Sequence, residues 1–292
     1  MSQWQRRTFS APGLTQVPPG PHIDALARRS KRIVRITRRS GSAGIGPYSE
    51  WAGQNRIASA RADQYGNASG SEYDLIEDGS IIETKVLVLN FCSEVNLHQP
   101  KAALERKGFT LVELRDCRSL SEELADAAEL WLISDSSQRL TPEALDAIEA
   151  YFADGRGLYI WGDNSPYFVD ANLVLRRLFG VAMFGDSPGD QVVSMRTAAA
   201  TSGLVPGHLV TTGLVNIYEG RTIAEVPTTE SLQPLVYGSN GRVVTAYFDD
   251  GERRAIVDGG FTRLYYKWDT AGTDRYVINA AAWLLNIERF DR

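Results

Sequence analysis

Short apolar runs alternate with amphipathic segments along the chain after residue 84. Four runs, at 85–90, 110–114, 130–134 and 157–161, have the length and character of strands buried on both faces. Between them, residues 97–107 predict a helix that ends at Gly108, and residues 141–152 predict one with a Thr141 cap followed by Pro142. A capping-box spacing at 119–122 and a segment at 172–179 predict two more helices. Such alternation predicts a parallel sheet with right-handed crossovers.

The second half of the chain has more strand patterns and fewer helical ones. Strands are predicted at 192–195, 221–226, 233–237, 243–248 and 254–257, and a closing helix at 276–285. Turn residues at 239–241 and 249–251 predict hairpins between neighbouring strands. We therefore expect an α/β fold with a mostly parallel central sheet over residues 81–292.

Residues 1–80 have a different composition and are treated as an N-terminal arm. Proline and glycine are frequent in residues 1–22, and residues 40–72 are rich in glycine, serine, asparagine and alanine. Between these segments lies a basic cluster that fits helical and strand periods equally. Its cations, which we expect to bind a partner, are Arg28, Arg29, Lys31, Arg32, Arg35, Arg38 and Arg39.

Charge is divided unevenly along the chain. The whole chain has a net charge of -5, but residues 1–62 hold eleven Arg or Lys and two acids, so they carry +9 and the rest carries -14. The arm could neutralise nucleic-acid phosphates, or it could dock on an acidic protein surface of its own domain or of a second copy. The opposite charges of arm and body favour docking.

Composition also limits the classes of protein to which the chain could belong. The apolar fraction is 43%, no run approaches the roughly 20 apolar residues of a membrane helix, and the N-terminus shows no secretion signal, so we expect a cytoplasmic protein without membrane attachment. The two cysteines are too few for a disulfide scaffold. The three histidines lie far apart and no CxxC or HExxH spacing occurs, so we expect no transition metal and no cofactor.

The pattern resembles the class I glutamine amidotransferase-like fold and its ThuA-like relatives. The segments that carry the resemblance are 86–90, 130–135 and 150–162, in which a helix ends at a glycine turn and leads into a central strand. The resemblance covers roughly residues 84–288, does not extend to residues 1–80, and implies a flavodoxin-like three-layer sandwich.

In that family a cysteine nucleophile follows this strand, and a histidine and an acid follow a late strand. Here the first turn reads Trp161-Gly162-Asp163-Asn164, and the second reads Asp258-Gly259-Gly260 without a histidine. We therefore expect no glutaminase activity, because thiol-based amide hydrolysis needs a nucleophile and a base within reach of each other.

Polar groups at the predicted strand ends form the candidate ligand-binding rim. If the strands are parallel neighbours, these groups meet at one edge of the sheet. The set comprises Ser134, Asp135, Gly162, Asp163, Asn164, Asp258, Gly259, Gly260, Thr262 and Arg263.

Three kinds of chemistry are open at this rim. Asp163 and Asp258 could be a general acid and base or hold Mg²⁺ or Ca²⁺, but a role as cap residues is favoured, particularly for Asp163. Cys92 with His98 could be a nucleophile and its base, although a structural thiol is commoner. Lys267 with Arg263 could hold a small anionic ligand, stack on rings, or brace the loop through carboxylates.

These patterns predict a non-catalytic binding or assembly module that acts through its arm and rim, with a protein partner or a homo-oligomer. One alternative is a ThuA-like hydrolase or carbohydrate-active enzyme that uses the strand-end carboxylates. The other is nucleic-acid binding through the arm.

Overall fold

The computed structural model describes residues 61–62, 68–69, 75–76, 78–79, 81, 84–268 and 271–286. The basic cluster at 28–39 therefore lies outside the described residues. Of residues 61–69, the short strands β1 (Arg61–Ala62) and β2 (Ala68–Ser69) pair antiparallel. Closer to the sheet, Ile76 packs into the core, and Asp78 pairs with the buried ammonium of Lys107 at 2.5 Å.

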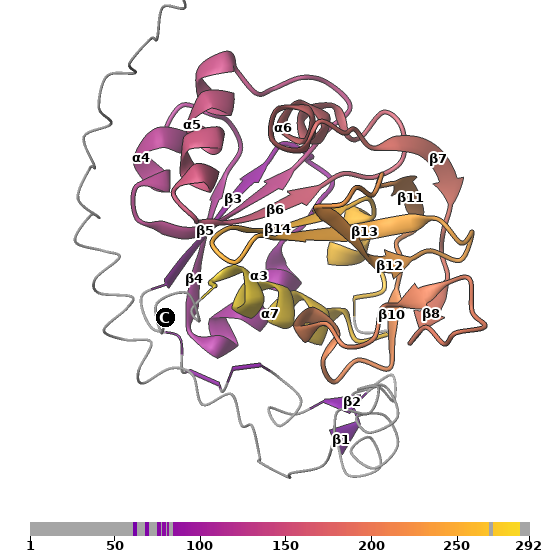
Figure 1. Ribbon diagram of the computed structural model, residues 1–292. Coiled ribbons are helices and arrows are strands. Elements are labelled where there is room, and N and C mark those ends of the chain that lie inside the picture. Colours follow the sequence, from indigo (N-terminus) through magenta and orange to yellow (C-terminus); the bar gives the residue numbers. More distant parts are fainter. Residues whose placement is uncertain are drawn as a thin grey trace, which may run out of the picture.

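An eight-stranded sheet organises the described chain (Figure 1), in the order β4-β3-β5-β6-β14-β13-β12-β9. The strands are β3 (Thr84–Asn90), β4 (Phe109–Leu114), β5 (Ala127–Ile133), β6 (Gly157–Trp161), β9 (Gly203–Leu204), β12 (Leu232–Tyr237), β13 (Val243–Asp249) and β14 (Arg254–Asp258). The first five in the sheet order are parallel, and β13, β12 and β9 continue antiparallel. The parallel part has the 2-1-3-4-5 order of a flavodoxin-like fold, so the expected fold class is confirmed.

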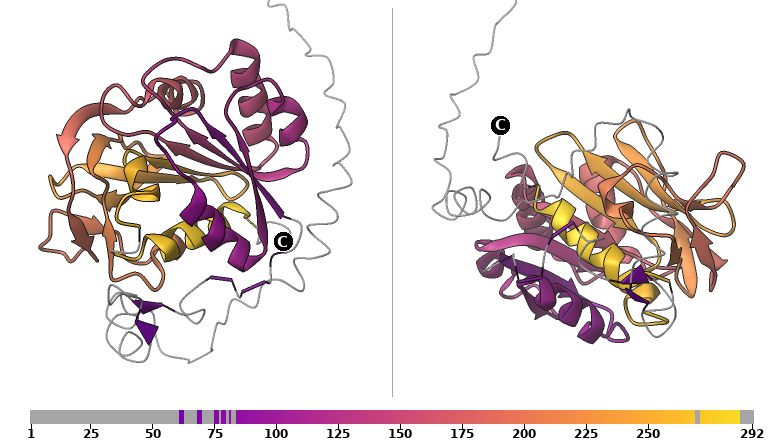
Figure 2. Two further views of the ribbon diagram at one scale, coloured as in Figure 1. Left: turned by 180° about the vertical axis from the view of Figure 1, so that it is seen from behind. Right: turned by 90° about the horizontal axis from the view of Figure 1, so that it is seen from below.

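Helices cover both faces of the sheet, as the views in Figure 2 show. One face carries α3 (His98–Lys107) and α7 (Thr273–Leu284), which contact each other. The other carries α4 (Leu120–Leu124), α5 (Pro142–Ala153) and α6 (Val169–Phe179). Two hydrophobic clusters, one on each face, form the core. No helix in the described part of the chain is long and apolar enough to cross a membrane.

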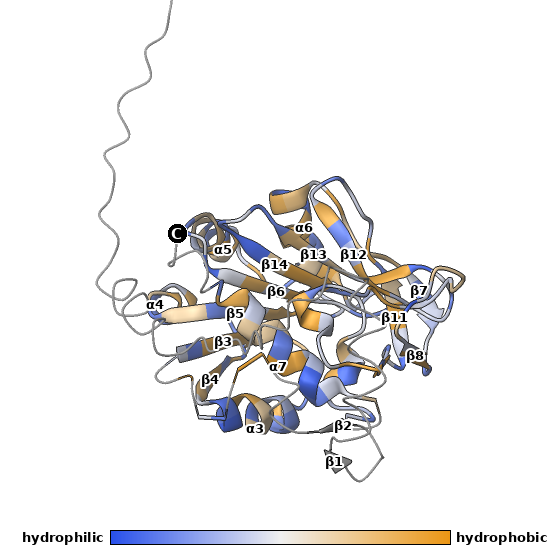
Figure 3. Ribbon diagram, turned by 60° about the horizontal axis from the view of Figure 1, so that its bottom comes forward, coloured by the Kyte–Doolittle hydropathy of each residue, from blue (hydrophilic) through white to orange (hydrophobic). Residues whose placement is uncertain are grey.

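Strand periodicity explains why both clusters form. In β3, Val86 and Val88 enter one cluster while Leu87 and Leu89 enter the other, because successive side chains point to opposite faces. All seven residues of β5 are buried, as expected for a central parallel strand. Figure 3 shows apolar colouring along these strands.

Local helix signals hold with three differences, one of which is that α7 starts at Thr273, before the expected residue 276. Thr141 Oγ1 accepts from Ala144 N–H, and Gly108 ends α3 with a left-handed φ of 98°, as predicted. Ser119 precedes α4 but makes no capping bond through its side chain, so the capping box is absent. Helix α6 starts at Val169, before the expected residue 172, because its first turn is held by a contact with another strand, described below.

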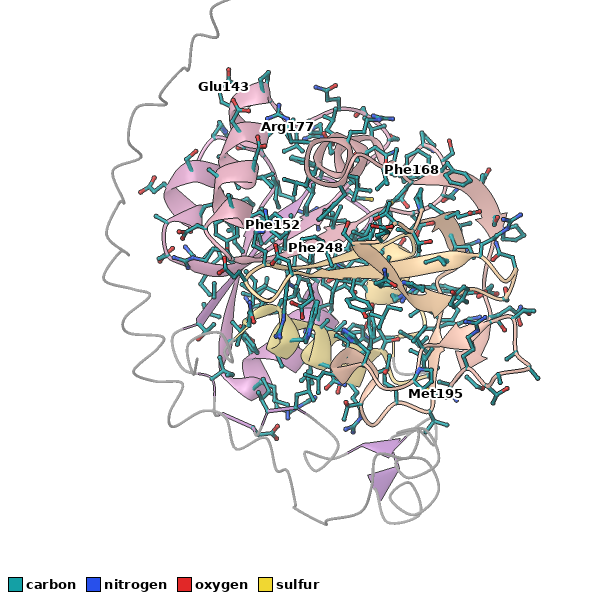
Figure 4. All side chains as sticks on the ribbon, viewed as in Figure 1. Glu143, Phe152, Phe168, Arg177, Met195 and Phe248 are labelled. Carbon is teal, nitrogen blue, oxygen red and sulfur yellow. The ribbon has the colours of Figure 1, made fainter. Side chains whose placement is uncertain are left out.

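Aromatic rings tie the second face together across distant segments. Phe152 of α5 lies 5.8 Å from both Phe248 of β13 and Phe179 of α6, between ring centroids. Figure 4 labels Phe152 and Phe248 side by side where α5 meets the sheet.

Two small antiparallel ribbons lie beside the carboxyl ends of the central strands. One pairs β7 (Phe184–Pro188) with β11 (Thr222–Glu225), and the other pairs β8 (Val192–Ser194) with β10 (Asn216–Tyr218). Two short 3₁₀ turns, η2 (Leu209–Thr211) and η3 (Phe261–Leu264), complete the described elements. Strand β7 was not predicted, because its residues are mostly exposed and four of the five are turn formers. Strands β9 and β10 were not predicted either.

Candidate functional site at the strand-end rim

The structure brings the four predicted strand ends to one edge of the sheet. Asn90 pairs with Ile133, Ile133 with Trp161, and Trp161 with Asp258, so these residues form one row across β3, β5, β6 and β14. The loops that follow this row form the rim. Asp258, the last residue of β14, and Asp163, on the turn after β6, thus lie at the same edge of the sheet.

The Asp258 carboxylate is wholly buried at 0% exposure. Its Oδ1 accepts from Gly260 N–H at 3.0 Å, and its Oδ2 lies 3.2 Å from Nη1 of Arg263, which is also at 0% exposure. The Thr245 and Tyr276 hydroxyls donate to Oδ2, each at 3.1 Å, and the Tyr159 hydroxyl lies 3.3 Å from Oδ2 and donates to the Tyr276 hydroxyl at 2.8 Å. Both oxygens of this carboxylate are thus engaged inside the protein.

Burial and mutual attraction both shift the pKa values of Asp258 and Arg263. Burial raises the pKa of Asp258, while the Arg263 guanidinium and the hydroxyl donors oppose the rise. Burial acts to lower the pKa of Arg263, but Asp258, Tyr276, Tyr159 and Glu219 together outweigh it and raise the pKa. Arg263 also donates to the Glu219 carbonyl at 2.7 Å, so it braces the loop after β14 and cannot reach a ligand.

Asp163, on the turn after β6, is also at 0% exposure. Its Oδ1 accepts from Asn164 N–H at 2.8 Å and from Thr222 Oγ1 at 2.5 Å, and its Oδ2 accepts from Thr262 N–H at 3.2 Å. Burial raises the pKa of Asp163 to about 6, although these donors oppose the rise. The carboxylate therefore ties the turn to β11 and to η3.

The favoured role of Asp163 as a helix cap is wrong. The first amides of α6, those of Asp170 and Ala171, donate to Ser134 Oγ at 3.0 and 3.2 Å. Ser134, at the end of β5, is thus a buried helix-holding residue, and it explains why α6 starts early. Asp135 is half-buried, and its side chain accepts from Ser136 N–H at 2.7 Å.

The rim glycines are required by packing. A Cβ on Gly259 would lie 2.4 Å from the Ala224 carbonyl oxygen, and one on Gly260 would lie 2.4 Å from that of Glu219. A Cβ on Gly162 would lie 2.6 Å from Met183 Sδ. The backbone of the β10–β11 segment therefore occupies the space that an open, ligand-accepting loop would need.

Further contacts seat the β7–β11 ribbon over the turn after β6. Asn164 donates through its side chain to Asp186 at 2.9 Å, and Ser165 N–H donates to the Gly185 carbonyl at 2.9 Å. Together with the bond from Thr222 to Asp163, they cover the position at which the resemblance places a nucleophile.

Cys92 and His98 do not form a nucleophile and base. Cys92 is 2% exposed, and burial raises the pKa of its thiol, whereas an activated thiol has a lowered pKa. His98 is exposed at the first position of α3, and no hydrogen bond between the two side chains occurs in this described segment. Cys92 is a buried structural thiol.

Lys267 lies apart from Arg263 and is exposed. Its Nζ pairs with Asp190 at 2.6 Å and lies 5.3 Å from the ring centroid of Tyr218 and 5.5 Å from that of Tyr266. Asp269, another carboxylate close to this loop in the sequence, is outside the described residues. Within the described part of the chain, no group of three or more histidine, cysteine, aspartate or glutamate side chains could hold a metal ion.

Sequence reasoning missed most of the partners that define this rim. They are Tyr159, Glu219, Thr222, Thr245 and Tyr276. Tyr159 could have been found, since it lies two residues before Trp161 and shares its face of β6. The others come from distant elements and leave no local signal.

No known sequence family matches this chain, and no curated protein is similar in sequence. Several solved structures are similar in shape. A ThuA-like protein from Bacteroides uniformis is 16% identical, with a TM-score of 0.46 over 70% of this chain and 91% of that one. A GMP synthase component from Thermoplasma acidophilum is 11% identical, with a TM-score of 0.44 over 70% of this chain and 96% of that one.

A glutamine amidotransferase from Thermotoga maritima is 9% identical, with a TM-score of 0.39 over 72% of this chain and 96% of that one. Similarity at this level carries no conclusion about activity. The chain is an α/β sandwich by its own strand order, and its solved neighbours include amidotransferase-like and ThuA-like proteins.

Proposed function

We propose that this chain is a non-catalytic binding or assembly module built on an amidotransferase-like sandwich. The observation that carries the proposal is the complete burial of both strand-end carboxylates, Asp163 and Asp258. A general acid or base must come within hydrogen-bond reach of the proton it transfers. Both groups instead accept hydrogen bonds from the protein's own backbone and side chains.

Binding is proposed to involve the arm, which supplies the +9 charge of residues 1–62 against -14 in the rest. An acidic surface, most favourably on a second copy of the chain, would pair with its arginines through forked hydrogen bonds. Nucleic-acid binding through the same cations stays a second prediction.

Glutaminase activity tests the non-catalytic role. We expect no release of ammonia from glutamine by the full chain, because the turn after β6 has no cysteine and Cys92 is a buried thiol with a raised pKa. The assay compares wild type with Cys92→Ala and with a heat-unfolded sample. Ammonia release that disappears in Cys92→Ala would overturn the proposal and restore the Cys92–His98 pair.

One observation favours the hydrolase alternative. Asp163 has a pKa of about 6, which suits a general acid at neutral pH, but it would have to become exposed by movement of the β7–β11 ribbon. Hydrolysis of glycosides or esters that is abolished in Asp163→Ala, while the variant keeps the wild-type circular dichroism spectrum, would favour this alternative.

A further inference from the structure

Two cations lie over one exposed tyrosine ring next to the rim. The Arg221 guanidinium lies 5.7 Å from the ring centroid of Tyr266, and Lys267 Nζ lies 5.5 Å from it. Tyr266 is 37% exposed, so part of the ring remains open to solvent. An accessible aromatic ring beside two cations has the chemistry to bind a flat ring together with an anion.

Arg221 is held ready at this position. Its N–H donates to Thr262 Oγ1 at 2.8 Å, and its carbonyl accepts from Gly189 N–H at 3.0 Å. Its exposed side chain forms no ion pair with any carboxylate in the described part of the chain, whereas Lys267 pairs with Asp190 at 2.6 Å. These bonds fix the Arg221 backbone, and in the described part of the chain no carboxylate would have to be displaced from its guanidinium by an anion.

The backbone around Lys267 is unusual. Among the described non-glycine residues, only Asp190, Lys267 and Asn286 have a left-handed φ, and the first two, at 64° and 49°, are joined by this ion pair. Tyr218 hydroxyl also donates to Asp190 at 2.8 Å. Residues kept in such conformations by their surroundings cluster at functional sites.

The location agrees with a ligand site. Tyr266 follows η3, which is entered directly from the Asp258-Gly259-Gly260 turn at the carboxyl end of β14. In open α/β sheets, ligands bind outside the carboxyl ends of the strands. Unlike the two buried aspartates, Arg221, Tyr266 and Lys267 can be reached from solvent.

We propose that Arg221, Tyr266 and Lys267 form a binding site for a small phosphorylated compound that carries a flat ring, such as a nucleoside monophosphate. The guanidinium would take two phosphate oxygens in its planar fork, and the ring would stack on Tyr266. Lys267 is paired with Asp190, so Arg221 supplies the unbalanced positive charge of the site. The proposal rests on the binding role of the rim and names the class of its ligand.

The test is calorimetric titration of the full chain with adenosine 5′-monophosphate, with adenosine and inorganic phosphate as separate probes. We expect the monophosphate to bind more tightly than either probe. Arg221→Ala should weaken binding about tenfold or more, since hydrogen bonds to charged groups carry that much affinity. Arg221→Lys should weaken it less, and Tyr266→Phe should bind as wild type while Tyr266→Ala loses about tenfold.

The matched control is Arg118→Ala, because Arg118 is a highly exposed arginine at a distant site and the variant changes the net charge equally. It should bind as wild type. No binding of the monophosphate, or equal affinity in Arg221→Ala, Tyr266→Ala and wild type, would overturn the site and leave the non-catalytic role standing. Release of phosphate from the bound compound would instead contradict the non-catalytic role and leave the site.

Discussion

At the scale of single residues, the buried charged side chains stabilise the fold. Asp258 and Arg263 form an ion pair in which both side chains are at 0% exposure. Removing one member of such a pair leaves the other as an uncompensated buried charge, which costs far more than a surface pair contributes.

Asp258→Asn should therefore lower the free energy of unfolding by about 3–5 kcal/mol, measured by urea denaturation. The double variant Asp258→Asn with Arg263→Met should lose less than the sum of the two single changes, because it removes both charges. Asp250→Asn, which breaks an exposed pair with Arg253, is the control and should change stability by no more than about 1 kcal/mol. Equal effects of Asp258→Asn and the control would refute the structural role.

Glu129 gives a residue-scale prediction for pH. It is wholly buried at the start of β5, where its Oε2 accepts from Trp131 Nε1–H at 3.0 Å, and burial raises its pKa well above the ordinary value. The folded state thus keeps a proton that the unfolded state releases above about pH 4.3. The free energy of unfolding should therefore fall as pH rises above about 4.3. This group contributes up to about 1.4 kcal/mol per pH unit to that fall.

Glu129→Gln should remove that slope while keeping an acceptor for Trp131. The measurement is the difference in unfolding free energy between wild type and variant from pH 5 to pH 8, which cancels the contribution of Asp163. The free energy of unfolding of the variant should increase relative to that of wild type as pH rises. A difference that is independent of pH would show that Glu129 does not hold an extra proton in the folded state.

At the scale of elements, the β7–β11 ribbon decides the character of the rim. It contacts the turn after β6 through Asp163, Asn164 and Ser165, and it covers the site where the resemblance places a nucleophile. Loops at strand ends usually stay open for ligands. Here two turns and a ribbon close over buried carboxylates.

Thr222→Val should weaken the attachment of this ribbon to the turn after β6, because it removes the hydrogen bond to Asp163. The Thr222 hydroxyl stabilises the ionised form of Asp163, so its loss should raise the pKa of Asp163 above about 6 and lower stability by about 1–3 kcal/mol. Carboxyl-carbon NMR titration follows the pKa, and amide exchange of β7 follows the opening. Thr228→Val, at an exposed position, should change neither. An unchanged Asp163 titration would contradict the contact.

At the scale of the whole molecule, the proposed role depends on the arm. Removal of residues 1–74, which keeps Ile76 and the Asp78–Lys107 pair, should lower the oligomeric mass in light scattering and make the mass less sensitive to salt. The sheet should keep its cooperative melting transition. An unchanged mass, together with rapid proteolysis of the full-length arm, would show that the arm does not mediate assembly.

Most helices and strands can be predicted from the amino-acid pattern alone. Apolar runs such as 85–90, the Thr141–Pro142 start of α5 and the αL glycine at 108 each act over a few residues, so local pattern suffices to predict them. It also predicted the sheet class, because alternating strands and helices allow few topologies. Ser119 shows the limit even locally, since its spacing fits a capping box whose bond does not form.

The burial and the hydrogen-bond partners of the rim residues depend on the tertiary structure. Asp163 reaches Thr222, 59 residues away, and Asp258 reaches Tyr159, 99 residues away, so their burial depends on pairings that no local pattern encodes. The sequence placed the aspartates at the carboxyl edge but left acid, metal ligand and cap open. Burial favours a structural role, because neither carboxylate is exposed to solvent and both accept hydrogen bonds from the protein's own donors.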